Sequence, residues 1–191
     1  MTINTESRLP RNPLAQRGAS TIWIMLLTVA STVTTLLLSC ATPFPALAAL
    51  AAVHMHRRDG MTLMGLAWLA SQLTGFLILG YEMKETTTGW AIGLAVAALG
   101  SAAGAYAALD RLGGRSIALR LAVAYGAGFV AFKLVILAFS VWLGGVATTL
   151  DPDILARQFL RNGAILIGLF ALYHGLVALG VPAARGRAAA A

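Results

Sequence analysis

Long runs of hydrophobic residues dominate the chain, and short polar segments separate them. A bilayer core about 30 Å thick is crossed by about 20 apolar residues in a helix. Such runs predict six transmembrane helices, because a helix satisfies every backbone polar group within lipid. The predicted helices are Thr21–Ser39, Pro45 to Val53 or Met55, Met61–Gly80, Thr88–Leu109, Ile117 to about Val146, and Asn162–Val181.

The predicted fold is therefore an all-α integral membrane bundle of six helices. It comprises a polar N-terminal tail (1–19), a transmembrane domain (20–182) and a C-terminal tail (183–191). Pro43 and Pro45 forbid a regular continuing helix after the first span. The second helix is short, so we expect it to be tilted or partly behind its neighbours. The segment Ile154–Leu160 predicts a short surface helix.

Composition agrees with this class. Hydrophobic residues make up 59% of the 191 residues and charged residues 11%, against about 45–50% and about 25% in soluble domains. This excludes a disordered tail and an ordinary soluble enzyme. One cysteine excludes an internal disulfide. The first apolar run lacks a clean signal-peptidase site, which favours a retained helix over a cleaved signal.

The chain has a net charge of +7, and its basic residues are distributed as expected for a membrane protein. The basic residues flank apolar runs and do not gather on one face, which argues against a nucleic-acid partner. The opposite side has only three basic residues, Lys84, Arg157 and Arg161, and the positive-inside rule places both termini in the cytoplasm. Ten basic residues fall on the predicted cytoplasmic side: Arg8, Arg11, Arg17, Arg57, Arg58, Arg111, Arg115, Arg120, Arg185 and Arg187.

Cys40 is the first candidate for chemistry. It stands at the predicted outer end of the first helix, directly before the proline-broken turn. A thiolate is a soft metal ligand and a good nucleophile. The alternative is that Cys40 is a small apolar side chain that closes a helix.

Two further polar residues interrupt apolar runs. Lys133 lies near the middle of the fifth helix, where a charge usually faces a bundle interior or water. It is predicted to contact a polar or anionic ligand group, or else to snorkel or form a structural pair. His174 is predicted to bind a ligand or shuttle protons, or else to hydrogen-bond a neighbour. Gln72, Tyr81 and Tyr125 are further candidates for ligand contacts.

Small residues recur at helical spacing. Ala48 with Ala52, and Gly100 with Gly104, form small-xxx-small pairs that allow close helix approach in lipid. These pairs predict either packing within the bundle or docking on a partner membrane subunit.

The segments Cys40–Leu50, Arg57–Gly60 and Gly65–Gln72 resemble the small BtuM-type cobalamin transporters of Gram-negative bacteria. These are similar to the S components of energy-coupling-factor transporters. The resemblance implies a multi-pass protein of the bacterial inner membrane that binds cobalamin from the periplasmic side and moves it inward. Cobalamin is then the transported ligand, and no intrinsic cofactor is expected.

The resemblance also implies a role for one residue. A family cysteine ligates the corrinoid cobalt and promotes loss of cyanide from cyanocobalamin, and Cys40 alone can take that role here. It would be the cobalt ligand and the catalytic residue of decyanation. S components dock on an energising membrane subunit with ATPases, whereas some BtuM-type proteins lack a dedicated module.

Other functions stay open from the sequence. The chain fits an S component for another vitamin or a metal, whose binding would not need the thiol. It also fits a small structural subunit of a larger membrane complex. A lipid-modifying enzyme has little support, because the sequence contains no paired carboxylates, catalytic triad or metal cluster.

Overall fold

The computed structural model describes residues 13–37 and 43–184, with side chains over 18–34 and 43–184. Within these ranges the chain is helical and contains no strand, which confirms the all-α class. The elements are α1 (Pro13–Leu37), α2 (Phe44–His54), α3 (Arg57–Leu73), the π-helix η1 (Thr74–Ile78), α4 (Glu85–Asp110), α5 (Ile117–Leu143), α6 (Val146–Leu150) and α7 (Pro152–Ala178).

Four helical segments in the described part of the chain are long and apolar enough to cross a membrane. They are α3 continued by η1, then α4, α5 and α7. The first two predicted spans are helical but give shorter apolar stretches, Gly18–Thr34 and Phe44–His54. The structure thus has the apolar, helical character of a membrane protein.

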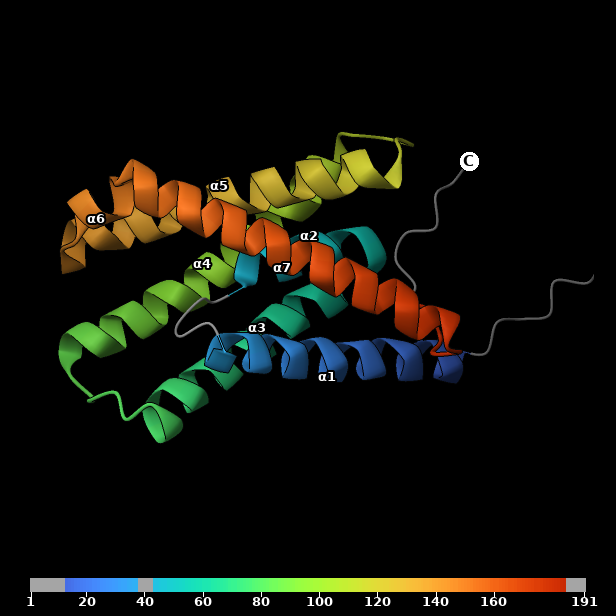
Figure 1. The fold of residues 1–191 in the computed structure, drawn as a ribbon, viewed down its shortest axis with the longest axis horizontal. Helices are drawn as coiled ribbons and strands as arrows, with labels where there is room; N and C mark the ends of the chain where they lie inside the picture. The colour runs from blue at the N-terminus through green and yellow to red at the C-terminus, as the bar shows by residue number, and fades with distance from the viewer. Residues whose placement is uncertain (1–12, 38–42, 185–191) are drawn as a thin grey trace, which may run out of the picture.

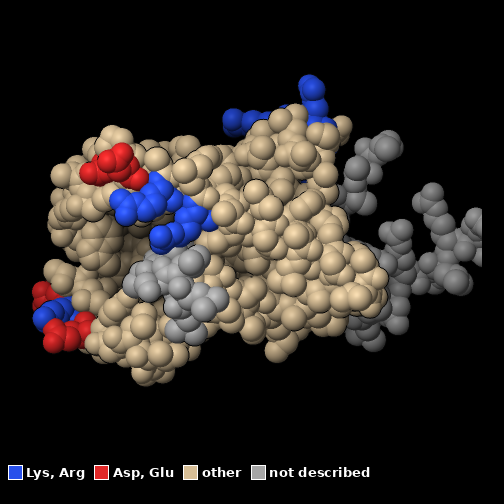
Figure 2. Space-filling view, in the orientation of Figure 1, with Lys and Arg blue, Asp and Glu red and all other residues tan. Residues whose placement is uncertain are grey.

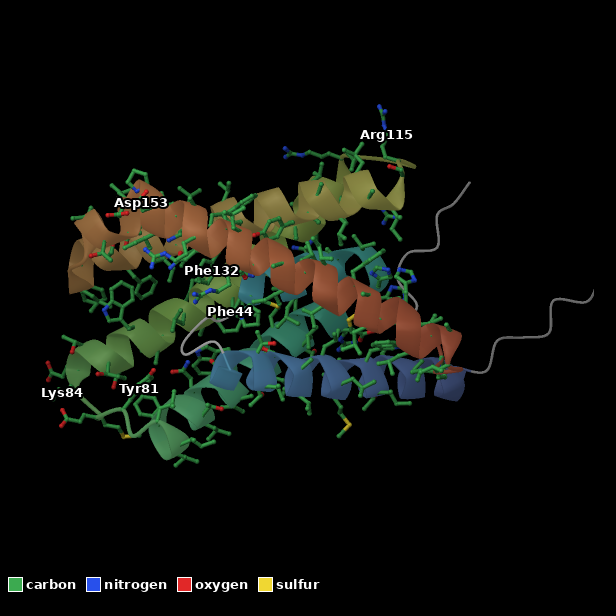
Figure 3. All side chains as sticks on the ribbon, viewed as in Figure 1. Phe44, Tyr81, Lys84, Arg115, Phe132 and Asp153 are labelled. Atoms are coloured by element: carbon green, nitrogen blue, oxygen red, sulfur yellow. The ribbon has the colours of Figure 1, made fainter. Side chains whose placement is uncertain are left out.

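The helices run back and forth between two ends of the molecule (Figure 1). We call one the Tyr81 end, formed by the connections at 79–84 and 144–151. We call the other the Arg57 end, formed by the connections at 55–56 and 111–116. Figure 3 shows Tyr81, Lys84 and Asp153 at the first end and Arg115 toward the second.

The predicted surface helix at Ile154–Leu160 is wrong as a separate element, because α7 runs unbroken from Pro152. Asp151 caps it: its side chain accepts hydrogen bonds from the backbone N–H groups of Asp153 (2.9 Å) and Ile154 (3.0 Å). Proline at the first turn is also compatible with helix initiation.

The fifth helix also ends earlier than expected. It stops at Leu143, where Gly144 and Gly145 have φ values of +90° and +95°. This region of backbone space is open mainly to glycine. The chain therefore turns before Val146, and α6 begins there.

The core of the bundle is α2. Phe44 through Val53 are all buried, and α2 packs against α3, α4, α5 and α7. Figure 1 shows it in the middle of the other helices. A helix that is apolar on every side is stable only when surrounded, which explains why this short segment sits behind its neighbours, as the sequence predicts.

The small-residue pairs pack inside the chain. Ala48 is fully buried and Ala52 is 8% exposed. A Cβ atom at Gly104 would stand 2.8 Å from the Ala131 side chain, and one at Gly100 would stand 3.3 Å from Val135. Glycine thus lets α4 and α5 approach closely, and both pairs serve internal packing.

Both predicted tails contribute to the fold. α1 begins at Pro13, inside the predicted polar tail 1–19. Trp23 on α1 is fully buried and donates a hydrogen bond from Nε1 to the Pro182 carbonyl (2.7 Å). Tyr173 donates to the carbonyl of Ala184 (3.3 Å), a buried residue of the predicted C-terminal tail. The first bond joins α1 to the segment after α7, and the second fastens that segment to α7.

The carboxyl end of α2 is held by one tyrosine. The Tyr106 hydroxyl lies 3.1 Å from the Ala51 carbonyl oxygen and 3.2 Å from that of His56. Backbone N–H groups also donate to these carbonyls, Met55 to Ala51 (2.7 Å) and Gly60 to His56 (2.9 Å), so the hydroxyl is a second donor at the junction of α2 and α3. Gly60 makes room for the ring, since a Cβ there would stand 2.1 Å from the Tyr106 hydroxyl oxygen.

We therefore expect Gly60→Ala to destabilise the protein by about 1–3 kcal/mol, because the added methyl group overpacks this contact. The measurement is thermal unfolding in detergent. Gly65→Ala is the matched control, because it lies on the same helix and has no described neighbour within 4 Å of the new Cβ. An equal loss in both variants would contradict this account.

Candidate functional site

The amino end of α2 lies deep inside the bundle. Phe44, its first residue, is fully buried, and its ring centroid is 6.3 Å from that of Phe132. Phe132 belongs to the middle of α5, a 27-residue helix. Figure 3 shows the two rings side by side in the interior. The described start of α2 is therefore level with the middle of a membrane-length helix.

A helix end at this depth is chemically unusual. In lipid, non-helical backbone is tolerated only where protein covers it or where it lines a cavity. The amino end of a helix also carries partial positive charge, and transporter binding sites are typically built on such interrupted helices. Cys40 itself lies outside the described residues.

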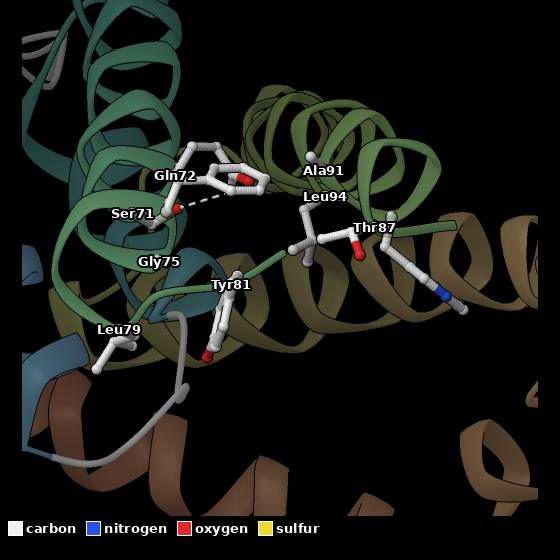
Figure 4. Close-up of a pocket in the computed structure, with 10 residues that line it drawn as sticks. Ser71, Gln72, Gly75, Leu79, Tyr81, Thr87, Ala91 and Leu94 are labelled. Carbon is white, nitrogen blue, oxygen red and sulfur yellow. Dashed lines mark hydrogen bonds between the residues drawn. The ribbon is translucent and has the colours of Figure 1, made fainter. Parts of the chain in front are cut away.

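A cavity of about 200 Å³ lies between α3 with η1 on one side and α4 on the other (Figure 4). Its walls are mainly apolar, with a few polar side chains, which is the usual composition of a small-molecule site. The lining residues are Ser71, Gln72, Gly75, Phe76, Leu79, Tyr81, Thr87, Trp90, Ala91 and Leu94.

The π-helix η1 shapes one wall. The backbone N–H of Leu79 donates to the Thr74 carbonyl (3.0 Å), and that of Tyr81 donates to the Gly75 carbonyl (3.1 Å). A Cβ atom at Gly75 would stand 2.9 Å from the Tyr81 ring. The wide turn and the glycine thus seat Tyr81 against the end of the helix. Such π-turns occur frequently at functional sites.

Hydrogen bonds order the wall above Tyr81. Trp68 donates from Nε1 to the Ala91 carbonyl (2.9 Å), which ties α3 to α4. Ser71 donates to the Trp68 carbonyl (2.7 Å), and the Gln72 amide donates to the Ser71 hydroxyl (3.2 Å; Figure 4). The half-buried Gln72 amide therefore presents polar groups at the cavity wall.

Two of the predicted ligand contacts, Gln72 and Tyr81, are thus brought together. Lys133 is half-buried in the middle of α5, directly after Phe132, and is not among the lining residues. Tyr125 is buried between α5 and α7, where its hydroxyl donates to the Phe159 carbonyl. This places Tyr125 in a helix–helix contact.

His174 lies elsewhere. Its exposed ring is 4.3 Å from the Phe170 ring and 5.7 Å from that of His54, between centroids. His54 ends α2 at the Arg57 end. Gln72 is 15 residues after Arg57 along α3, or about 22 Å at the rise of an α-helix. The structure therefore separates His174 from the cavity.

Sequence reasoning missed most of the cavity wall, including Phe76, Thr87 and Trp90. The π-turn has no simple sequence signature, but the pair Gly75 and Gly80 inside an apolar run was a usable signal, because Gly80 has a φ of +68° and ends the element.

Positive charge is present near the same end of the molecule. Figure 2 shows a group of Lys and Arg side chains over the amino-terminal half of α7. The basic residues of α7 are Arg157 and Arg161, and both are exposed. They are four residues apart, so they lie on one face of the helix.

The described residues contain no group of three or more His, Cys, Asp or Glu that could hold a metal ion. No family model, curated protein or solved structure matches the chain.

We expect Trp68→Phe to lower the unfolding free energy by about 0.5–1.5 kcal/mol, because the ring is kept but the bond to the Ala91 carbonyl is lost. Thermal unfolding in detergent measures this loss. The control is Trp142→Phe, at a side chain that is 83% exposed. If the control variant loses as much stability, the Trp68 bond does not tie α3 to α4.

Proposed function

We propose that the chain is a cobalamin transporter of the bacterial inner membrane, with both termini in the cytoplasm. It would bind cobalamin from the periplasmic side, at the Tyr81 end, and move it inward. The observation that carries the proposal is that the amino end of α2 is buried next to Phe132, in the middle of α5. Cys40 stands four residues before Phe44, the first residue of α2. The choice of cobalamin as the ligand rests on the sequence resemblance around Cys40.

The proposed chemistry at Cys40 is ligand exchange at cobalt. A thiolate is a soft, strongly donating ligand and suits an axial position of the corrinoid metal. Its electron donation weakens the bond to cyanide, which leaves with the bonding electron pair and takes a proton from water. Cobalt keeps its oxidation state, so the decyanation needs no reductant.

The proposal assigns further contacts to residues of the described surface. The Gln72 amide would meet polar groups on the corrin rim, while Phe76 and Trp90 would cover its apolar faces. Arg157 and Arg161 supply charge for the phosphodiester of cobalamin. Lys133, one position from Phe132, is a further contact for a polar group that enters along α5.

The volume of the cavity limits which ligand can enter it without a change of conformation. The cavity of about 200 Å³ is below the usual range for drug-sized ligands, about 300–1,000 Å³. A corrinoid would enter only if the η1 wall moves away from α4. The same size favours the second candidate, an S component for a smaller vitamin, whose binding would not depend on Cys40.

The proposed energising partner, a membrane subunit with ATPases, needs a docking face. Ala48 and Ala52 are buried by this chain's own helices. Docking would therefore use exposed apolar residues such as Met25 and Val29 on α1, which are 65% and 62% exposed.

The test is the visible absorption spectrum of cyanocobalamin mixed with the purified protein. We expect a shifted spectrum that co-elutes with the wild-type chain and is lost in Cys40→Ala, because only the thiolate would replace an axial ligand. Binding with an unshifted spectrum in both proteins would remove the cysteine chemistry. Absence of binding would refute cobalamin as the ligand.

A second measurement tests the cavity. We expect Gln72→Ala to weaken cobalamin binding by about two- to tenfold, the range for one lost hydrogen bond. The control is Gln158→Ala, an exposed glutamine of α7 outside the cavity lining. Unchanged affinity in Gln72→Ala would place the ligand away from this wall.

A further inference from the structure

A second cavity lies at the Arg57 end, away from the candidate site. It has a volume of about 320 Å³ and is formed where the α2–α3 junction meets the carboxyl end of α4 and the first turn of α5. Its lining residues are Ala52, Met55, His56, Arg57, Tyr106, Leu109, Asp110 and Arg120. It shares no residue with the cavity at the Tyr81 end.

The polar half of this cavity is basic. Arg57 comes from α3 and Arg120 from α5, so two guanidinium groups reach it from different helices. His56 adds ring nitrogens, and Asp110 contributes one carboxylate. Among the lining residues, two guanidinium groups stand against one carboxylate, and Asp59 in the first turn of α3 is a second carboxylate near Tyr106 that does not itself line the cavity. Guanidinium groups bind phosphate with charge-assisted hydrogen bonds.

The start of α3 adds backbone donors at the same place. His56 is the N-cap of α3, and its side chain makes no capping hydrogen bond among the described residues. The first N–H groups of a helix have no intrahelical acceptor, and the helix dipole favours an anion beside them. His56 and Arg57, at this helix start, line the cavity directly.

The other half of the cavity is apolar. Ala52, Met55 and Leu109 form it, at the end of helices whose outward faces carry large hydrophobic side chains. A basic wall beside an apolar one matches an amphiphile, with a phosphate group joined to a hydrocarbon part. Basic pockets between transmembrane helices are known to hold anionic lipid headgroups.

We propose that this cavity binds a phosphate group, carried by the headgroup of an anionic membrane phospholipid. Arg57 and Arg120 hold the phosphate oxygens, and the first N–H groups of α3 complete the site. The lipid would thereby join α3, α4 and α5 at the Arg57 end. The site is separate from the proposed transport of cobalamin and does not rest on it.

The experiment measures thermal unfolding of the full-length chain in detergent. The probes are phosphatidylglycerol, phosphatidylcholine, and inorganic phosphate against chloride at equal ionic strength. We expect phosphatidylglycerol to raise Tm saturably and phosphatidylcholine to leave it unchanged. In Arg57→Gln/Arg120→Gln, the half-saturating concentration of phosphatidylglycerol should rise about tenfold or more, as for loss of charged hydrogen bonds.

The matched control is Arg58→Gln/Arg115→Gln, which removes two exposed arginines of the same end that do not line the cavity. An equal loss in the control would overturn the proposal, since it would show diffuse charge attraction. No response to either phospholipid or phosphate would also overturn it. A shift with phosphate alone, lost only in the cavity variant, would keep the phosphate site and assign it to a free anion.

If the double variant Arg57→Gln/Arg120→Gln fails to fold, the single variant Arg57→Gln replaces it, because Arg57 is exposed and its substitution should not disturb the fold. Native mass spectrometry then counts retained phosphatidylglycerol directly. We expect fewer retained lipids in Arg57→Gln than in Arg58→Gln, and equal numbers would contradict the site.

Discussion

The structure depends on the burial of one short helix. α2 has 11 residues, ten of them buried, and four other helices surround it. Every polar group at its ends must find a partner inside the protein, because neither water nor lipid reaches it easily. At the carboxyl end the Tyr106 hydroxyl supplies one, and Gly60 makes that approach sterically possible. At the amino end Phe44 sits at the middle of α5. The packing of α3, α4, α5 and α7 around a common centre follows from placing this helix there.

Much of the helical layout was predictable from the sequence, because apolar length is a strong signal. α4 and α5 begin within three residues of their predicted starts. The failures have local physical causes. Asp151 and Pro152 start α7 early, and Gly144 with Gly145 end α5 before Val146. The depth of α2 was not predictable, since an apolar run reads the same whether it meets the surface or ends in the interior. The burial of α2 and the contact between Phe44 and Phe132 reveal that depth.

The candidate site was predictable to a smaller extent. Gln72 and Tyr81 stood out as polar residues beside apolar runs, and the π-turn at Gly75 brings them to one cavity. His174 stood out by the same reasoning, yet it packs with Phe170 and His54 at the opposite end. Sequence spacing cannot distinguish these cases, because the turns between the helices decide which end of the bundle a residue faces. The Arg57–Arg120 cavity was missed for the same reason, since its two arginines are far apart in sequence.

The packing also indicates which wall of the candidate site can move. α4 and α5 are joined by a line of glycines, where added Cβ atoms at Gly93 and Gly104 would come within 2.9 and 2.8 Å of the facing helix. Such close-packed seams resist separation, because every contact along them would be lost together. The opposite wall is tied to α4 by the Trp68 bond to the Ala91 carbonyl, while Tyr81 packs on Gly75 within that wall itself. Opening toward a larger ligand would therefore move η1 and the end of α3, while α4 and α5 stay together as the fixed side.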